Sequence, residues 1–125
     1  MTRLRMSSVY DPIYFTRQEF KACSPACDLD DMQPDFLRML DRLREMCGFP
    51  LHLNSCYRSL DYELKKGRSG TSMHALGRAA DIRCIDAYKR YQIISNAMLI
   101  GFEGIGVGSG FVHVDNRDGE RFWTY

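Results

Sequence analysis

Residues 105–115, which read IGVGSGFVHVD, decide the fold class of this 125-residue chain. Ile105–Val107 and Phe111–Asp115 are two short runs rich in apolar and β-branched residues, separated by the turn Gly108-Ser109-Gly110. Two such runs around a short glycine-containing turn indicate a β-hairpin. Because a hairpin pairs its strands antiparallel, the sequence predicts an α+β fold. We expect a small antiparallel sheet packed against helices, and no doubly wound parallel sheet.

The other expected elements follow from capping signals and hydrophobic spacing. Thr16 and Glu19 match a capping box, which predicts the start of a short helix. Residues 34–47 place apolar side chains at three- and four-residue spacing, which predicts a longer helix ended by Gly48. The remaining expectations are a strand at 51–55, a loop at 60–73 with one helical turn at its start, a strand at 79–84, a helix at 86–100 with Tyr91, Ile94 and Met98 on one face, and an edge strand at 121–125.

The composition is that of an ordinary globular domain. Hydrophobic residues make up 45% of the chain and charged residues 26%, with a formal net charge of +1. No strong field therefore favours nucleic acid or a membrane surface as a partner. No apolar run approaches the ~20 residues of a membrane span. We expect one monomeric domain over residues 1–125, with residues 1–12 as an N-terminal extension.

The cysteines and the N-terminus bear on the redox environment. Residues 1–8 carry positive charge but no apolar segment follows them, which predicts that the chain has no secretory signal. Five cysteines are an odd number, so reduced thiols are expected. Cys23 and Cys27 have the spacing of half a structural metal site. No second pair of ligands follows, which favours buried or surface thiols.

His74, Asp81 and His113 are the candidate metal ligands, and they include two of the three histidines in the chain. Two imidazoles and one carboxylate are the donors expected of a catalytic zinc ion, which keeps a fourth position open for water. Alternate side chains of a strand share a face, so His113 and Asp115 are expected to point to one side and the valines between them into the core.

Two further residues lie near these motifs. Gly77 is expected to allow a close approach between His74 and the strand that carries Asp81. His52 alternates with two leucines and is expected on the strand surface or behind the ligands.

Five segments of the chain resemble one known family. They are residues 14–20 (YFTRQEF), 55–59 (SCYRS), 72–82 (SMHALGRAADI), 101–107 (GFEGIGV) and 111–115 (FVHVD). In order and spacing they resemble the zinc D-Ala-D-Ala carboxypeptidase family of the Hedgehog/DD-peptidase superfamily, over residues 13–123. The resemblance implies a Hedgehog/DD-peptidase-like fold and a Zn²⁺ cofactor.

The resemblance also implies roles for single residues. It implies that the three candidate ligands bind the zinc ion and that Arg58, with Tyr57 beside it, contacts the substrate. A guanidinium near a metal can bind a peptide carboxylate or stabilise an oxyanion. Ser72 is placed to hydrogen-bond within the site.

The sequence departs from the superfamily at the general base. Many of these peptidases carry Glu or Asp three residues before the last zinc histidine, where this chain has Gly110. Asp115 is the predicted substitute, because it shares the face of His113 and a proton acceptor is needed for hydrolysis. Glu103 is the second candidate. The alternative for Asp115 is a structural contact with Arg117 or a backbone amide.

The predicted function is a zinc peptidase that hydrolyses an amide bond in bacterial peptidoglycan. The resemblance implies a stem peptide or cross-bridge containing D-amino acids, and leaves open whether the enzyme is a carboxypeptidase or an endopeptidase. Without a secretory signal, the expectation is synthesis in the cytoplasm and action on the cell wall after release by another route, as for a phage or bacterial lysin. The alternative is a non-catalytic zinc-containing binding or structural domain of the same fold.

Overall fold

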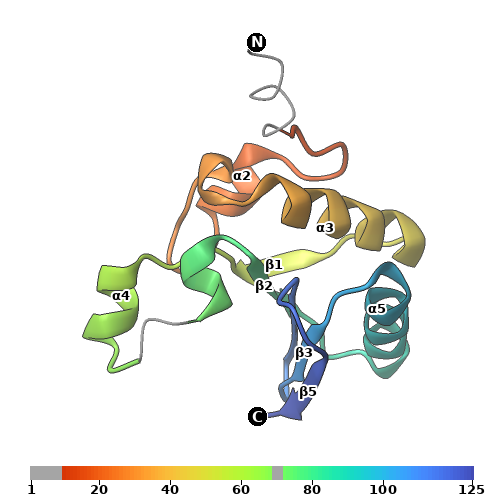
Figure 1. The fold of residues 1–125 in the computed structure, drawn as a ribbon. Coiled ribbons are helices and arrows are strands. Elements are labelled where there is room, and N and C mark those ends of the chain that lie inside the picture. Colours follow the sequence, from red (N-terminus) through yellow and green to blue (C-terminus); the bar gives the residue numbers. More distant parts are fainter. Residues whose placement is uncertain (1–9, 69–71) are drawn as a thin grey trace.

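A five-stranded sheet forms the centre of the protein, for which a computed structural model describes residues 10–68 and 72–125 (Figure 1). The strand order is β1-β2-β4-β3-β5. Neighbouring strands pair antiparallel, except for β3 and β5, which run parallel. The predicted α+β class, the hairpin and the edge strand are confirmed. The strands are β1 (His52–Ser55), β2 (Ala79–Arg83), β3 (Gly104–Val107), β4 (Phe111–Asp115) and β5 (Arg121–Thr124).

The helices begin and end at the residues that cap them. Thr16 and Glu19 form the predicted capping box in front of α2. The longer helix α3 ends at Gly48, whose φ of 74° is in the left-handed region that favours glycine. Asp86 caps α5 by accepting a hydrogen bond from the backbone N–H of Lys89. The helices are α2 (Arg17–Lys21), α3 (Pro34–Cys47), α4 (Leu60–Lys65) and α5 (Ala87–Ile100), with two 3-10 turns, η1 (Leu29–Asp31) and η2 (Met73–Leu76).

The hydrophobic core lies between the helices and one face of the sheet. Val112 and Val114 of β4 are fully buried in it, as their alternation predicts. Helix α5 buries Ile93 and Ala97, while Tyr91 is exposed. Of the three residues expected together on one face of α5, Tyr91 and Met98 are exposed, whereas Ile94 is partly buried against the core. In Figure 1, α5 and α4 lie on opposite sides of the strands.

Asp41 of α3 fixes the chain that precedes α2. Its carboxylate accepts hydrogen bonds from the Tyr10 hydroxyl at 2.6 Å and from the backbone N–H groups of Ile13 at 2.7 Å and Tyr14 at 3.1 Å. Residues 1–9 of the expected N-terminal extension lie outside the described residues. Within the described part of the chain, no helix has the length and hydrophobicity needed to cross a membrane.

Candidate metal centre

The structure brings together the three predicted ligands on the face of the sheet opposite the core. Asp81 of β2 and His113 of β4 are directly paired across the two strands, and His74 reaches them from η2. Asp81 Oδ1 lies 2.9 Å from His113 Nδ1 and 3.4 Å from His74 Nε2. The ligand atoms all lie within 4.8 Å of one another. His74 and His113 are almost fully buried, and the Asp81 side chain is 16% exposed.

His74 is oriented by the backbone carbonyl of Cys56, at its ring, and by the hydroxyl of Ser72, at its backbone. Its Nδ1 atom lies 2.5 Å from the carbonyl oxygen of Cys56, which can only accept a hydrogen bond. This contact fixes the proton on Nδ1 and leaves the Nε2 lone pair for a metal. Ser72 caps η2 by accepting a hydrogen bond from the His74 backbone N–H at 3.0 Å.

Gly77 ends η2 with a φ of 70°. A Cβ atom at this position would lie 2.3 Å from the carbonyl oxygen of Asp31. The close approach predicted at Gly77 is therefore present, but it is made to the backbone around Asp31 and Gln33 and was expected against β2. Gly77 also accepts a hydrogen bond from the Gln33 N–H at 2.9 Å. The segment before α3 thus sets the position of His74.

His113 is held from behind by Asp115, two residues along the same strand. Asp115 Oδ2 lies 2.7 Å from His113 Nε2, so the other ring nitrogen, Nδ1, faces Asp81. Arg117 binds the same carboxylate through Nε at 2.8 Å and Nη2 at 2.7 Å, and its backbone N–H adds a third contact at 3.1 Å. Asp115 is fully buried. The structural contact with Arg117 that the sequence left open is therefore present.

Trp123 of β5, which was not predicted from the sequence, forms one wall of the site. Its ring centroid lies 5.2 Å from that of His113, and the Arg117 guanidinium lies 4.9 Å from the centre of its ring. A Cβ atom at Gly106 would come within 2.5 Å of the indole. The signal that could have revealed this contact is the glycine at alternate positions 104 and 106 of one strand, since such glycines mark a close approach.

The charges of the centre support one another. Burial alone would raise the pKa of Asp81, but hydrogen bonds from His113 and His74 hold it well below its usual range. Burial also opposes ionisation of Asp115, and the bonds from Arg117 and His113 again lower the pKa far below normal. For His113, burial lowers the pKa, but Asp115 and Asp81 outweigh it and raise the net value. Without metal, a proton on His113 therefore holds two carboxylates together.

Arg58 lies at the edge of the three ligands. Its Nη1 atom is 3.7 Å from Asp81 Oδ2 and 3.2 Å from the hydroxyl of Ser55. Its Nε atom is 3.4 Å from Oε2 of Glu63, a fully buried carboxylate that also binds Arg68 at 2.9 Å. Burial raises the pKa of Glu63, but Ser72 and the two arginines lower it below its ordinary value. The predicted position of Arg58 beside the metal ligands is thus present.

The other two residues predicted for the site, Tyr57 and Glu103, form no hydrogen bond or ring contact with the three ligands in the described part of the chain. Tyr57 packs against the hydrophobic core, and no hydrogen bond or ring contact joins its side chain to the ligands among the described residues. Glu103 binds the backbone N–H of Gly119 at 2.9 Å and lines a cavity with Met98 and Phe122. No contact between Glu103 and the three ligands is present within 10–68 and 72–125.

The cysteines stay outside this centre. All five are free thiols, and Cys23 Sγ lies 4.0 Å from Cys56 Sγ in the core. In the described part of the chain, the metal-binding side chains that come together are His74, Asp81 and His113, and no cysteine is among them. The interpretation of Cys23 and Cys27 as buried thiols is confirmed.

The donor set fits a zinc ion. Two imidazole nitrogens and one carboxylate oxygen within 4.8 Å of one another match the ligands of mononuclear catalytic zinc sites, and the contacts behind both rings are those that such sites use. An α+β domain with this centre is of the metallohydrolase class. The chain matches the sequence model of the Peptidase M15 family over residues 13–115 and belongs to that family, whose members are zinc-dependent peptidases. No curated protein sequence matches the chain.

Proposed function

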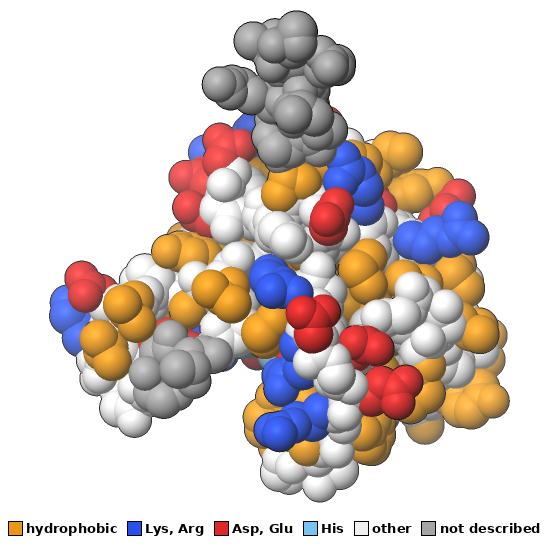
Figure 2. Space-filling model, in the orientation of Figure 1, with side chains coloured by type: hydrophobic (Ala, Val, Ile, Leu, Met, Phe, Trp, Pro, Cys, Tyr) orange, Lys and Arg blue, Asp and Glu red, His pale blue; other side chains and the backbone are white. Residues whose placement is uncertain are grey.

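We propose that this protein is a zinc peptidase that hydrolyses an amide bond in peptidoglycan peptides containing D-amino acids. The observation that carries the proposal is the convergence of His74, Asp81 and His113 in a chain of the Peptidase M15 family. Figure 2 shows that the surface is hollowed between the part over α4 and the part over β5, which gives an extended peptide room beside these elements. The substrate class rests on the resemblance of the motifs to D-Ala-D-Ala carboxypeptidases.

The residues of the centre have different roles in the proposed reaction. His74 Nε2, His113 Nδ1 and an oxygen of Asp81 would hold the zinc ion, which supplies a Lewis acid for the scissile carbonyl and lowers the pKa of water. Arg58, close to Asp81 Oδ2, is placed to stabilise negative charge on the reacting carbonyl. Ser72 keeps η2 and its histidine in position.

Asp115 is better placed to orient His113 than to transfer protons for the reaction. Both of its oxygens are bound, and its lowered pKa makes it a weak base at neutral pH. We therefore propose a positioning role for Asp115 in place of the general base that the sequence suggested. A second candidate function is a zinc-containing domain without peptidase activity. It is favoured because both oxygens of Asp115 are bound and because Gly110 stands where an acidic base is expected.

A turnover assay separates these two functions. Purified muropeptides are incubated with the zinc-loaded protein, with and without a chelator, and the products are identified by mass spectrometry. We expect chelator-sensitive products that differ from the substrate by one water across an amide bond. Intact muropeptides, together with one firmly bound zinc per chain, would favour the non-catalytic domain.

Two histidine variants test the metal site itself. His74→Ala should lose most of the bound zinc, as measured by metal analysis, since it removes one of three ligands. His52→Ala is the matched control because His52 is exposed on β1 and is not one of the three converging ligands. Full zinc occupancy in His74→Ala would remove this site from the proposal.

A further inference from the structure

Arg58 and Arg83 both lie on the sheet face that carries the ligands, and they differ in how they are bound. Arg58 is mostly buried and lies against Ser55, Glu63 and Asp81. Arg83 is exposed at the end of β2. Within residues 10–68 and 72–125, its guanidinium has no hydrogen bond, ion pair or ring contact. Of these two cations, Arg83 has the donors free for a ligand.

The position of Arg83 follows from strand geometry. Asp81 and Arg83 are two residues apart on β2, so their side chains share a face, about 7 Å apart along the strand. Arg83 is paired with His52 on β1 and with Phe111 on β4, directly beside the Asp81–His113 pair. An extended peptide bound with its scissile carbonyl at the metal ligands would therefore place a side chain one or two residues away near Arg83.

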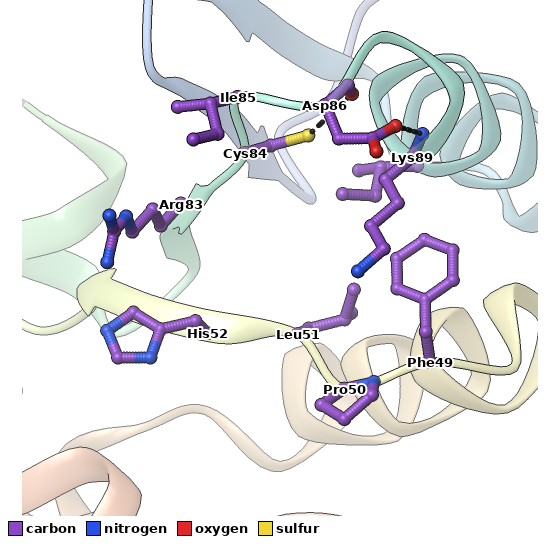
Figure 3. A pocket seen from close by; sticks show the side chains of 10 residues that line it. Phe49, Pro50, Leu51, His52, Arg83, Cys84, Ile85, Asp86 and Lys89 are labelled. Carbon is purple, nitrogen blue, oxygen red and sulfur yellow. Dashed lines mark hydrogen bonds between the residues drawn. The ribbon is translucent and has the colours of Figure 1, made fainter.

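A cavity lies where these two residues meet at the end of the sheet. Its volume is about 260 Å³, and His52 and Arg83 both line it. Figure 3 shows their side chains pointing to the same side of the strands, away from Leu51. Lys89, which packs on the ring of Phe49 at 5.3 Å, lies in the part of the cavity around Leu51, away from these two side chains. The acidic residue in the lining, Asp86, is engaged as the helix cap of α5.

We propose that Arg83, with His52 beside it, binds a carboxylate of the substrate peptide next to the scissile bond. The proposal rests on the peptidase function proposed above and adds to it a preference for acidic peptides. A guanidinium can bind a carboxylate with two parallel hydrogen bonds, and Phe111 is paired with Arg83 on the neighbouring strand β4. The amide form of the same residue would lose this charge-assisted contact.

The test uses two synthetic stem peptides that differ in one group, a free carboxylate or a carboxamide on the residue adjacent to the cleaved bond. Binding of uncleavable analogues is measured by calorimetry, and cleavage is measured as kcat/KM. We expect the protein to favour the carboxylate peptide by about 10- to 100-fold, the scale of one charge-assisted contact. Arg83→Met should abolish this preference by weakening the carboxylate peptide alone.

Arg42→Met is the matched control. Arg42 is an exposed arginine on α3 whose nearest acid, Glu45, lies 3.8 Å away at the surface, and its replacement should leave the preference unchanged. Circular dichroism checks that both variants are folded. His52→Gln should reduce the preference less than Arg83→Met does.

The outcomes separate this inference from the proposed function. Cleavage of both peptides with the same preference in wild type and Arg83→Met would overturn the subsite and leave the peptidase intact. Carboxylate-dependent binding that is lost in Arg83→Met, without any cleavage, would support the subsite and contradict the peptidase. Absence of both binding and cleavage in the wild type would overturn the subsite as well.

Discussion

Asp115 Oδ2 lies 2.7 Å from Nε2 of His113, on the side of the ring opposite Asp81. A carboxylate can only accept at neutral pH, so this contact places a proton on Nε2 and presents Nδ1 to the metal position. Carboxylates behind ligating histidines fix the ring orientation and raise the basicity of the ligand nitrogen. We therefore expect Asp115, which is held in place by Arg117, to strengthen the binding of a metal by His113.

The substitution Asp115→Asn tests this link. Because the amide cannot supply the negative charge behind His113, zinc affinity should fall by about 10- to 100-fold. Metal titration with a chromophoric chelator measures it. Asp118→Asn, an exposed neighbour on the same segment, is the control and should bind zinc normally. If Asp115→Asn binds zinc normally but loses about 10²-fold or more in rate, Asp115 transfers protons, as the sequence alone predicted.

Arg58 should not tolerate lysine. Its guanidinium lies against Ser55, Glu63 and Asp81 at once, which a single ammonium on a flexible chain cannot reproduce. Arg58→Lys should therefore keep its zinc content and lose cleavage, seen as a lower kcat/KM on muropeptides. Unchanged kinetics in this variant would show that Arg58 has a purely structural place in the loop.

Gly106→Ala should destabilise the protein by forcing Trp123 away from His113. The added Cβ atom would lie 2.5 Å from the indole ring, and overpacking of this kind costs about 1 to 3 kcal/mol. Urea unfolding monitored by tryptophan fluorescence measures the loss and also reports the environment of Trp123. Gly110→Ala is the matched control, since the nearest atom to its Cβ is Ile85 Cγ2 at 3.9 Å. Equal stability of the two variants would contradict the packing of Trp123 on β3.

The attachment of Tyr10 should give the protein an alkaline stability limit. The hydrogen bond to Asp41 raises the pKa of Tyr10 from its ordinary value of 10.0 to about 12. Because the folded pKa is raised, the contribution to stability is fully present below pH 10 and is lost as pH rises through about 12. The stability advantage of the wild type over Tyr10→Phe should therefore shrink between these values in thermal unfolding.

Tyr88→Phe serves as the control for this titration because Tyr88 is exposed on α5. Its stability should follow that of the wild type across the same pH range. A Tyr10→Phe variant with an unchanged difference from pH 9 to pH 12 would show that the Tyr10–Asp41 bond does not contribute to folding.

Local signals in the sequence predicted most of the elements, because they depend on neighbouring residues. The Thr16 capping box, the end of α3 at Gly48 and the hairpin before His113 are all set within a few residues of chain. The buried face of α5 was not predictable in this way. Ile93 and Ala97 are buried because α3 and β4 cover that side, and the exposed side of the helix is also apolar.

The candidate site also has a part that the sequence predicts and a part that depends on the assembled fold. The residue types and spacing of His74, Asp81 and His113 indicated a metal centre, and strand alternation placed His113 and Asp115 on one face. The Cys56 carbonyl behind His74, Glu63 beside Arg58 and Trp123 beside His113 are contacts between different segments of the folded chain. Such contacts depend on how the elements are assembled, which periodicity does not encode.

The wall of the site beside His113 comes from a different part of the chain than the ligands. The match to the Peptidase M15 family ends at residue 115, whereas Trp123 belongs to β5, and Tyr125 follows it with its ring 4.8 Å from Phe111. β5 joins the sheet through parallel pairing with β3, independently of the strands that carry Asp81 and His113. Residues 116–125 thus contribute to the site without supplying a ligand, since Trp123 lies beside His113 and Arg117 binds the carboxylate of Asp115 behind the same ring.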